Sequence, residues 1–347
     1  MQIMNAQMRA IVYTGPREFT LAQVPMPQPG SGEVRIKVVQ SGFCGTDTHL
    51  HEGEFLAAYP LTPGHETIGF VDALGPDVAN LELGTFVAVN PNSTCGVCDQ
   101  CRGGRPEVCK AFTGLGSGKP GGFAEYMLAP ADQVFDATGL DPDVAVFTEP
   151  LSCVMHAMDV LEHHAGRRAL VLGAGPTGIA MAQLLAHHGS EHVTIAASTE
   201  FKLDRACALG VHAKFVMTRG ELDADVQRLL ELSGGEGYDL VVEATGHPDV
   251  CQVCVPLTRD GGTVLFYGVA PESAVITISP YELFRRELTV RSSFCEVHSF
   301  PDALDALRQG HMRTEGIITH RYALDQYEDA LKAYHQDPGT HKIVIHP

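Results

Sequence analysis

The stretch LVLGAGPTG, residues 170 to 178, constrains the fold of this chain more than any other. An apolar run leads into a turn that carries Gly173, Gly175 and Gly178 at the spacing G-x-G-x-x-G, and a long helical stretch follows. In such a turn the glycines let the backbone approach a pyrophosphate closely, and the N-terminus of the following helix attracts the anion. We therefore predict a dinucleotide site in which Pro176 and Thr177 also take part.

The pattern on either side of this turn predicts a doubly wound parallel sheet. Apolar strands such as HVTIAAS, YDLVVEATG and GGTVLFYGVA alternate with helical stretches, and this order implies right-handed crossovers. Before about Phe135, short apolar alternations such as EVRIKVV are broken by glycine and proline clusters, which indicates a β-rich region. A length of 347 residues suits two domains. We expect one domain from residues 1–154 together with 292–347, and the other from residues 155–291.

Composition excludes some classes of partner. The formal net charge of −18 repels phosphate backbones, so we expect no nucleic acid. No uninterrupted apolar run approaches the roughly 20 residues of a membrane helix, so we expect no membrane contact. The start, MQIMNAQMRAIVYTG, has neither a basic leader nor a cleavage site, and we expect a cytoplasmic protein.

Four of the ten cysteines follow a metal-binding pattern. The segment CGVCDQCRGGRPEVC places Cys95, Cys98, Cys101 and Cys109 as C-x2-C-x2-C-x7-C. Two-residue gaps let successive thiolates face one centre, and the fourth closes a tetrahedral S4 site of the kind that structural zinc occupies. An iron–sulfur cluster is a weaker alternative. Four separate buried or paired thiols are another weak alternative, because strained local disulfides are unfavourable in a cytosolic chain.

A second group of residues suggests an open metal site. GFCGTDTHLHEGEF contains Cys44, PGHE contains His65 and Glu66, and VFTEPLSC contains Glu149. Mixed sulfur, nitrogen and oxygen ligands suit a zinc ion that keeps one position for water or substrate. Each residue alone is weak support, because a lone cysteine or histidine is often structural.

Taken together, these motifs resemble the zinc-dependent medium-chain dehydrogenase/reductase family over essentially the whole chain. The resemblance rests on GFCGTDTH, PGHE, the four-cysteine segment, EPLS, GAGPTG, VEATG and HKIVI, in this order. It implies an α/β protein with a GroES-like β-rich catalytic domain, a Rossmann domain and an active site in the cleft between them. It also implies two zinc ions, a catalytic one at Cys44 and His65, with Glu66 and Glu149 as direct or water-mediated ligands, and a structural one at the four cysteines. The glutamate before Pro-Leu-Ser resembles the sorbitol and polyol branch, and some stretches look most like arabinitol-type dehydrogenases.

The resemblance gives further residues roles around the catalytic zinc. Zinc lowers the pKa of an alcohol, so that hydride can leave the carbon. Thr46 would hydrogen-bond the substrate oxygen, His49 would relay the proton toward solvent, and Asp47 would orient the imidazole of His65. The alternatives are a turn-capping hydroxyl for Thr46, a surface histidine for His49 and a helix N-cap for Asp47. We interpret His51, Glu52 and Glu54 as a solvated loop at the mouth of the pocket, without a ligand role.

The cofactor site extends beyond the glycine turn. The resemblance adds the loops Ala244, Thr245, Gly246 and Tyr267, Gly268, Val269, and places Lys342 near the pyrophosphate. An NAD site usually carries an acidic residue about 20 residues beyond the glycines, but Ala197 stands there. Ser198, Thr199 and Lys202 or Arg205 could instead hold a 2′-phosphate, although Glu200 lies close by. We therefore expect NADP rather than NAD.

We assign no metal or catalytic site to the remaining cysteine and histidine pairs. Cys251 and Cys254 also form a C-x2-C pair, but they stand in a helical stretch and we expect buried side chains. The pairs His163–His164 and His187–His188 are treated as surface or cap residues.

The sequence thus predicts a zinc-dependent enzyme that reversibly oxidises a secondary hydroxyl of a small polyol to a ketone and transfers hydride to NAD(P). A threonine or simple-alcohol dehydrogenase on the same scaffold is the alternative enzyme, and a non-catalytic binding member of the fold is the alternative of another class. Intact GFCGTD, GHE and EPLS argue against the latter. The resemblance implies a homo-oligomer, either a dimer or a tetramer.

Overall fold

The computed structural model describes residues 6–54, 57–162 and 168–347, so His163 and His164 lie outside the described residues. The chain divides into two compact units. The first contains residues 1–152, 296–308 and 318–347, and the second contains residues 153–295 and 309–317. The α/β fold class with a β-rich part and a parallel-sheet part is confirmed. The closing segment is shared between the units, because Gln183 exchanges hydrogen bonds with the backbone of Arg313 at 3.1 and 2.9 Å and so keeps residues 309–317 on the second unit.

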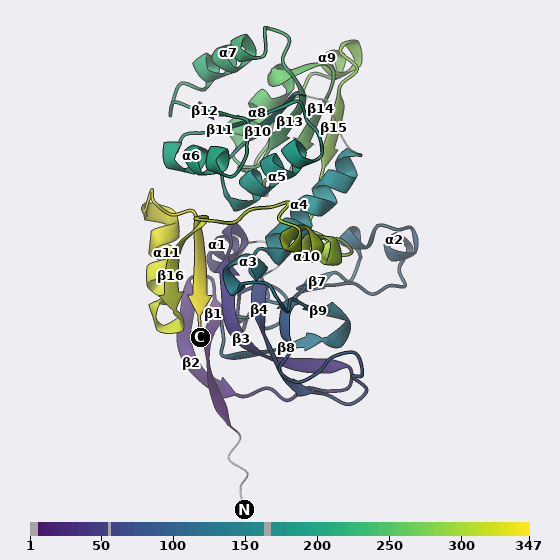
Figure 1. Ribbon diagram of the computed structural model, residues 1–347, viewed down its shortest axis with the longest axis vertical. Helices are drawn as coiled ribbons and strands as arrows, with labels where there is room; N and C mark the ends of the chain where they lie inside the picture. The colour runs from purple at the N-terminus through teal and green to yellow at the C-terminus, as the bar shows by residue number, and fades with distance from the viewer. Residues whose placement is uncertain (1–5, 55–56, 163–167) are drawn as a thin grey trace, which may run out of the picture. The chain divides into compact units, whose positions relative to one another are not determined.

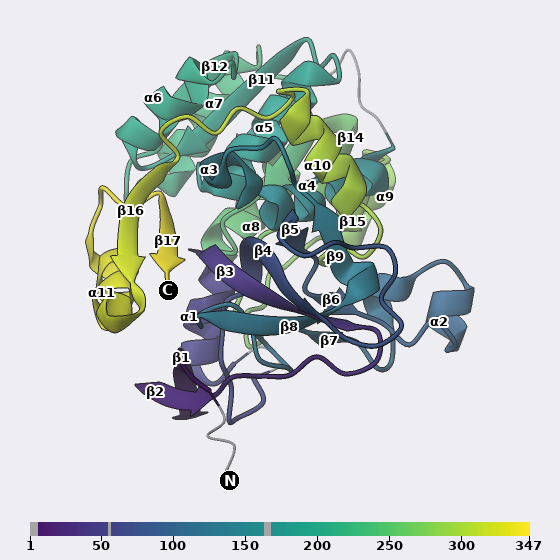
Figure 2. The same ribbon diagram turned by 60° about the horizontal axis from the view of Figure 1, so that its bottom comes forward.

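The first unit is built on an extensive mixed sheet (Figures 1 and 2). Among the described residues its strand order is β16-β17-β3-β4-β5-β9, with β8 paired to β3, and all neighbours are antiparallel except β16 and β17. The strands of this unit are β1 (Gln7–Gly15), β2 (Glu18–Pro25), β3 (Glu33–Phe43), β4 (Glu66–Leu74), β5 (Phe86–Val89), β6 (Asn92–Ser93), β7 (Thr113–Gly114), β8 (Tyr126–Pro130), β9 (Val134–Asp136), β16 (Ile318–Ala323) and β17 (Lys342–His346). Strands β1 and β2 form a separate hairpin, and β6 pairs with β7.

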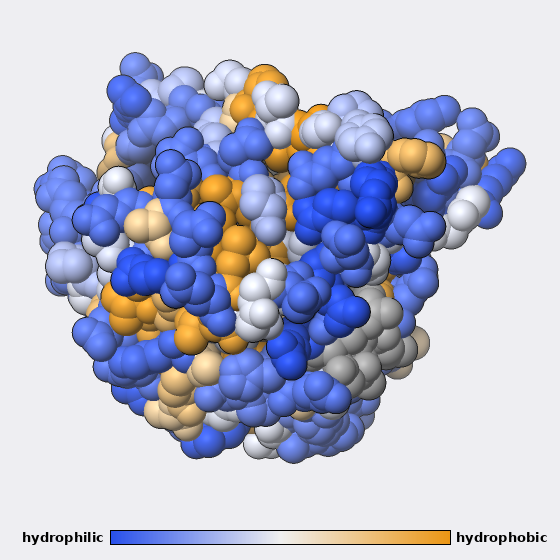
Figure 3. Space-filling view, turned by 90° about the horizontal axis from the view of Figure 1, so that it is seen from above, coloured by the Kyte–Doolittle hydropathy of each residue, from blue (hydrophilic) through white to orange (hydrophobic). Residues whose placement is uncertain are grey.

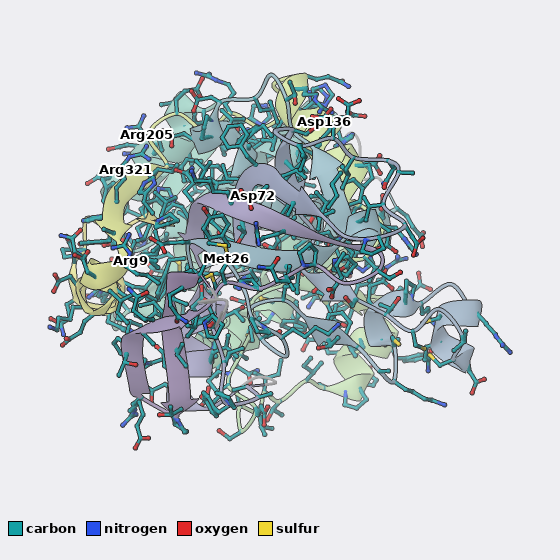
Figure 4. The ribbon with its side chains drawn as sticks, turned by 90° about the horizontal axis from the view of Figure 1, so that it is seen from below. Arg9, Met26, Asp72, Asp136, Arg205 and Arg321 are labelled. Carbon is teal, nitrogen blue, oxygen red and sulfur yellow. The ribbon has the colours of Figure 1, made fainter. Side chains whose placement is uncertain are left out.

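Alternation of apolar and polar residues fixes the register of this sheet. In β3, Val34, Ile36 and Val38 are buried on one face and join a core with residues of β4, β5 and β8. On the opposite face of β3, Arg35 contacts Asp72 of β4 at 2.6 Å. Asp72 is labelled in Figure 4. A one-residue slip would expose the whole apolar set, so the pairing that positions the site is strongly specified.

Short helices complete the first unit. They are α1 (Gly45–Glu52), α2 (Asp99–Arg102), α3 (Pro142–Ala145), α10 (Phe300–Arg308) and α11 (Tyr327–Gln336), with 3₁₀ turns η1 (Pro106–Val108), η2 (Ala131–Gln133) and η3 (Leu324–Gln326). Helix α4 (Thr148–Leu161) begins in the first unit and continues into the second. The aromatic rings of Phe43, Phe123 and Tyr327 pack together at centroid distances of 5.4 to 6.1 Å and anchor α11 near the end of β3.

The second unit is a parallel sheet with the order β12-β11-β10-β13-β14-β15 over the described part of the chain. Its elements follow one another as strand and helix: β10 (Arg168–Leu172), α5 (Pro176–His187), β11 (His192–Ala197), α6 (Glu200–Ala208), β12 (Ala213–Val216), α7 (Leu222–Leu232), β13 (Tyr238–Glu243), α8 (Pro248–Leu257), β14 (Thr258–Phe266), α9 (Pro280–Arg285) and β15 (Thr289–Ser292). The order reverses between β10 and β13, and the crevice at such a reversal is where open α/β sheets bind ligands.

The central strands of this sheet are buried on both faces. Residues 169–172 of β10 and residues 240–242 of β13 are inaccessible to solvent, as expected for strands covered by helices on both sides. Cys251 and Cys254 of α8 are buried in the same region, as the sequence analysis expects.

One stretch of the described residues, Pro142–Leu161, is long and apolar enough to cross a membrane by length and composition alone. It comprises α3 and α4, and 67% of its most apolar window is buried inside the structure. A core helix passes the same test, so this stretch is weak support for a membrane span.

The face shown in Figure 3 is mainly hydrophilic, with apolar side chains gathered in its middle.

Candidate metal and dinucleotide sites

The stretch after β3 folds as helix α1, which includes His51 and Glu52, two of the three residues expected in a solvated loop. Cys44 is the N-cap of α1, and the Oδ2 atom of Asp47, three residues on, accepts a hydrogen bond from the Cys44 N–H at 2.9 Å. This hydrogen bond gives the backbone N–H of the N-cap residue an acceptor and fixes the start of α1. His51, expected in the loop, lies on α1 with its Nδ1 atom 2.9 Å from the hydroxyl of Tyr13. The polar density of this stretch therefore partly serves helix formation and packing.

Cys44, His65 and Glu66 meet at one point in the first unit. A ligand atom from each lies within 4.8 Å of the other two. The sheet brings them together, because β3 and β4 are antiparallel neighbours and Gly42 pairs with Glu66, so the end of β3 and the start of β4 are adjacent. Thr46 stands beside this group, with its Oγ1 atom 3.8 Å from the sulfur of Cys44.

The surroundings of His65 suit a metal ligand. Its Nδ1 atom is buried and makes no hydrogen bond with the described residues, and it faces the Oδ1 atom of Asp47 at 3.7 Å. Burial lowers the pKa of His65, but Asp47 and Cys44 outweigh it and hold that pKa well above its usual value. The same negative groups that favour a proton there would favour a cation. A thiol, an imidazole and a carboxylate form the mixed donor set of an open zinc site, so the residues fit that ion.

The four cysteines of the α2 lobe also converge. Their ligand atoms lie within 4.8 Å of one another. The Sγ–Sγ distances are 3.6 Å for Cys98–Cys101, 3.9 Å for Cys98–Cys109 and 3.5 Å for Cys95–Cys109. A zinc ion bound to four sulfurs at about 2.3 Å holds them about 3.8 Å apart. These distances therefore suit a single tetrahedral ion.

Backbone donors favour the thiolate form at two of the four cysteines, Cys98 and Cys109. The N–H groups of Cys101 and Lys110 are the main cause that lowers the pKa of Cys98 to about 6. The N–H groups of Cys95 and Ala111 point at the sulfur of Cys109 at 3.3 Å each. Hydrogen bonds that stabilise the charged form favour deprotonation, which metal binding requires.

The second unit carries the glycine turn at the reversal of its sheet. Gly175 is the N-cap of α5, and Pro176 is its first residue. A Cβ atom on Gly178 would lie 2.1 Å from the carbonyl oxygen of Gly173, so only glycine allows this approach of helix to strand. The loops Ala244–Gly246 and Tyr267–Val269 follow β13 and β14, and they lie at the same edge because these strands are parallel to β10. The glycine turn and both predicted loops thus share one end of the sheet.

The end of β11 lacks an acidic side chain. Ala197 is its last residue, and Thr199 is the N-cap of α6. Glu200, which could repel a phosphate, contacts the ammonium group of Lys214 at 3.1 Å. Lys202 is half-buried and lies 5.9 Å from the centre of the Phe201 ring.

Comparison with known proteins agrees with this geometry. Residues 30–139 match the family described as alcohol dehydrogenase GroES-like domain, and residues 176–309 match the family described as zinc-binding dehydrogenase. D-arabinitol dehydrogenase 1 of Uromyces fabae is 38% identical over 330 residues, which cover 95% of each chain. The chain belongs to the zinc-dependent medium-chain dehydrogenases.

Two further relatives place this dehydrogenase in its family. D-altritol 5-dehydrogenase of Agrobacterium fabrum is 33% identical over 97% of this chain and 98% of its own. The crystal structure of a zinc-binding dehydrogenase from Sinorhizobium meliloti bound to NADP matches with a TM-score of 0.92 and 31% identity, over 99% of this chain and all of that one. The fold predicted from the sequence is therefore confirmed for the dehydrogenase.

Lys342 of the dehydrogenase lies beside the metal-binding group of the first unit, and its predicted place near the pyrophosphate stays a prediction. Its ammonium group forms an ion pair with Glu66, and it also donates to the carbonyl oxygen of Phe43 at 3.2 Å, while both charged side chains are almost fully buried. Burial lowers the pKa of Lys342, but Glu66 and Cys44 raise it more. The lysine therefore belongs to the surroundings of the metal-binding group, because β17 pairs with β3 in the first unit.

Glu149 is not one of the three residues whose ligand atoms gather. It lies in the first turn of α4, is 9% exposed, and its charge contributes to the raised pKa values of Lys342 and Glu296. Glu149 is therefore near the metal-binding group, and its role as a direct or water-mediated ligand stays a prediction.

Two partners in this region were missed by sequence reasoning. Glu296 is fully buried, accepts a hydrogen bond from Asn92 at 3.4 Å, and has a pKa raised to about 8 by burial and then by the charge of Glu149. Glu54 lies 2.8 Å from the Nδ1 atom of His49. Glu54 could have been found from the sequence, because it is an acidic residue only five positions after His49. Nothing in the sequence indicated that Glu296 lies in this region.

Proposed function

We propose that this dehydrogenase reversibly oxidises a secondary hydroxyl of a polyol of the arabinitol or sorbitol kind to a ketone and transfers hydride to a nicotinamide cofactor. The mixed group of Cys44, His65 and Glu66, backed by Glu149, carries the proposal. Relatives named for arabinitol and altritol support polyols as the substrate class. A carboxylate where simple-alcohol relatives carry a thiolate supports the same choice.

Within this proposal the metal-binding group holds the catalytic zinc. Bound there, zinc would act as a Lewis acid that lowers the pKa of the substrate hydroxyl. Glu149 would complete the ligand set directly or through water. Two zinc ions per chain follow if the four cysteines hold the second.

Neighbouring side chains would handle the proton. The hydroxyl of Thr46 lies close enough to the Cys44 sulfur to reach a substrate oxygen at the same centre. His49 is partly exposed and pairs with Glu54, which supports a path for the proton from the site to solvent. Asp47, held between the Cys44 N–H and the ring of His65, would orient that ring.

We propose NADP as the preferred cofactor. Ala197 removes the carboxylate that would repel a 2′-phosphate, Glu200 is paired with Lys214, and Lys202 forms no ion pair among the described residues. Ser198 and Thr199 offer hydroxyl donors at the same turn. The pyrophosphate would lie at Gly173 to Gly178, where α5 begins.

A spectrophotometric screen tests the substrate class. Arabinitol, sorbitol, altritol, threonine and ethanol are compared at equal concentrations with NAD and with NADP. We expect the highest kcat/KM for a polyol with NADP. If threonine or ethanol exceeds every polyol, the branch is wrong, and if no compound is oxidised by zinc-loaded protein, the non-catalytic alternative holds.

We also propose a homodimer, or a tetramer built from such dimers, in a reducing compartment such as the cytoplasm. Strand β15 is an edge of the parallel sheet, and Tyr281, Phe284 and Val290 near it are 72%, 79% and 39% exposed. An open edge with apolar neighbours favours pairing with a second copy about a two-fold axis. The cysteines of the described residues form no disulfide, which supports the reducing compartment.

A further inference from the structure

Glu243 occupies the reversal point of the parallel sheet in the second unit. It is the last residue of β13 and pairs in register with Leu172, the last residue of β10. In this sheet β11 lies on one side of β10, and β13 and then β14 lie on its other side. A dinucleotide in an open α/β sheet binds outside the carboxyl ends of the strands at this point. Glu243 nevertheless has no exposed surface.

The carboxylate of Glu243 holds the loop that follows it. Its Oε1 atom accepts hydrogen bonds from the Thr245 N–H at 2.7 Å and from the Thr245 hydroxyl. Both carboxylate oxygens accept from the Gly246 N–H at 3.1 Å. The backbone carbonyl of the same residue accepts from the N–H groups of Tyr267 and Gly268 at 2.9 Å each. One residue therefore ties together the loops after β13 and β14.

These loops are packed too tightly to move independently. A Cβ atom on Gly268 would lie 2.2 Å from the Gly246 nitrogen and 2.7 Å from the Oε2 atom of Glu243. A Cβ atom on Gly173, in the glycine turn, would lie 2.9 Å from the carbonyl oxygen of Ala244. A shift of the Glu243 carboxylate would therefore be transmitted to both loops and to the glycine turn.

We propose that Glu243 is a positioning residue for the dinucleotide: it sets the backbone of the loops that line the cofactor site without touching the cofactor. This inference rests on the proposed nicotinamide cofactor. Burial and then the charge of Glu243 raise the pKa of the Cys251 thiol to about 11, so this thiol stays neutral and adds no second negative charge near the carboxylate.

A purely structural role is the competing explanation, and the same unit offers a matched control. Asp225 of α7 is likewise fully buried, and its Oδ2 atom accepts from the Thr218 N–H at 2.8 Å. It supports a turn that none of the proposed cofactor residues belongs to. Glu243→Gln keeps an acceptor for Thr245 but turns an amide donor toward the Gly246 N–H. Asp225→Asn likewise replaces a buried carboxylate by an amide in the control, and it also removes an ion pair with Arg228.

The experiment measures the Kd for NADPH by fluorescence titration, together with the melting temperature, for the wild type and both variants. We expect Glu243→Gln to raise the Kd about tenfold or more while kcat at saturating cofactor stays within about threefold. Asp225→Asn should lower the melting temperature and leave the Kd unchanged. An unchanged Kd in Glu243→Gln, or equal rises in both variants, overturns the inference.

Two further results keep the test decisive. If Glu243→Gln does not fold, Thr245→Val removes the hydroxyl that donates to Glu243 and accepts from the His247 N–H at 2.9 Å. We expect its Kd to rise about two- to fivefold. An unchanged Kd in that variant then overturns the inference. A wild type that binds neither NADPH nor NADH refutes the proposed cofactor, and the inference is refuted with it.

Discussion

Cys44 is the residue whose substitution best isolates the mixed metal-binding group. Cys44→Ser replaces one ligand atom and leaves the packing of β3 and α1 in place, so we expect kcat to fall by at least about 100-fold. The melting temperature should change by only a few degrees, and zinc content should fall by one ion per chain. Activity assays and elemental analysis check this. Cys207→Ser, on the half-buried side of α6, is the matched control and should retain activity. An active Cys44→Ser enzyme contradicts the assignment.

A second residue-scale prediction concerns Ala197. Ala197→Asp restores a carboxylate at the end of β11, where it would accept from the ribose hydroxyls and repel a 2′-phosphate. We expect the ratio of kcat/KM for NADP over NAD to fall about tenfold or more, which corresponds to roughly 1.4 kcal/mol.

Ala213→Asp is the control for this change, because Ala213 begins β12 at the opposite end of the same sheet. It adds the same charge and should leave the ratio unchanged. A wild type that prefers NAD by tenfold would contradict the proposed cofactor, and an unaltered ratio in Ala197→Asp would contradict the reason given for it.

Among elements, the lobe from β6 to β7 depends on its four sulfurs more than on a core. Helix α2 has four residues and no buried side chain, so little apolar burial holds it. We expect Cys98→Ser to remove one zinc ion per chain and lower the melting temperature by about 5 °C or more. Differential scanning calorimetry with metal analysis measures both effects, and limited proteolysis should cut within residues 94–112. A variant that keeps full zinc and stability would show that the lobe needs no metal.

Site residues that are close together in the sequence could be predicted, whereas those brought together by strand order could not. The four cysteines and the glycine turn were predictable because neighbouring residues supply all the ligands at fixed spacing. The pairing of Lys342 with Glu66 was not, because it depends on β17 lying next to β3 and β3 next to β4. The sequence indicates these strands but not their order. Glu296 was missed for the same reason, since Asn92 is distant in sequence.

Helix α1 shows a different limit. GTDTHLHE has few apolar residues, and only Asp47 and Leu50 are buried, so periodicity gives almost no helical signal. The helix forms because Asp47 caps its start and because His51 reaches Tyr13. His51, which was expected in a solvated loop, is therefore one of the residues that hold the helix.

At the scale of the whole molecule, the parallel sheet could be predicted from the sequence, whereas the exposed surfaces could not. Alternating strands and helices identified the parallel sheet, because each covered strand must be apolar throughout. Sheet order leaves β15 at an edge, which only the structure reveals. The exposed apolar residues near that edge could therefore be interpreted as an interface only after the strand order was known.

The last prediction tests that edge. In the double variant Phe284→Asp with Val290→Lys, charges replace apolar side chains that are 79% and 39% exposed in the single chain, so a second copy would have to bury them. We expect analytical ultracentrifugation to show a dimer or tetramer for the wild type and a smaller species for the variant, with the melting temperature of the second unit nearly unchanged. Leu232→Asp, at the end of α7 and 65% exposed, is the control and should keep the wild-type assembly. A monomeric wild type would refute the proposed oligomer, whereas a variant that assembles like the wild type would place the interface elsewhere.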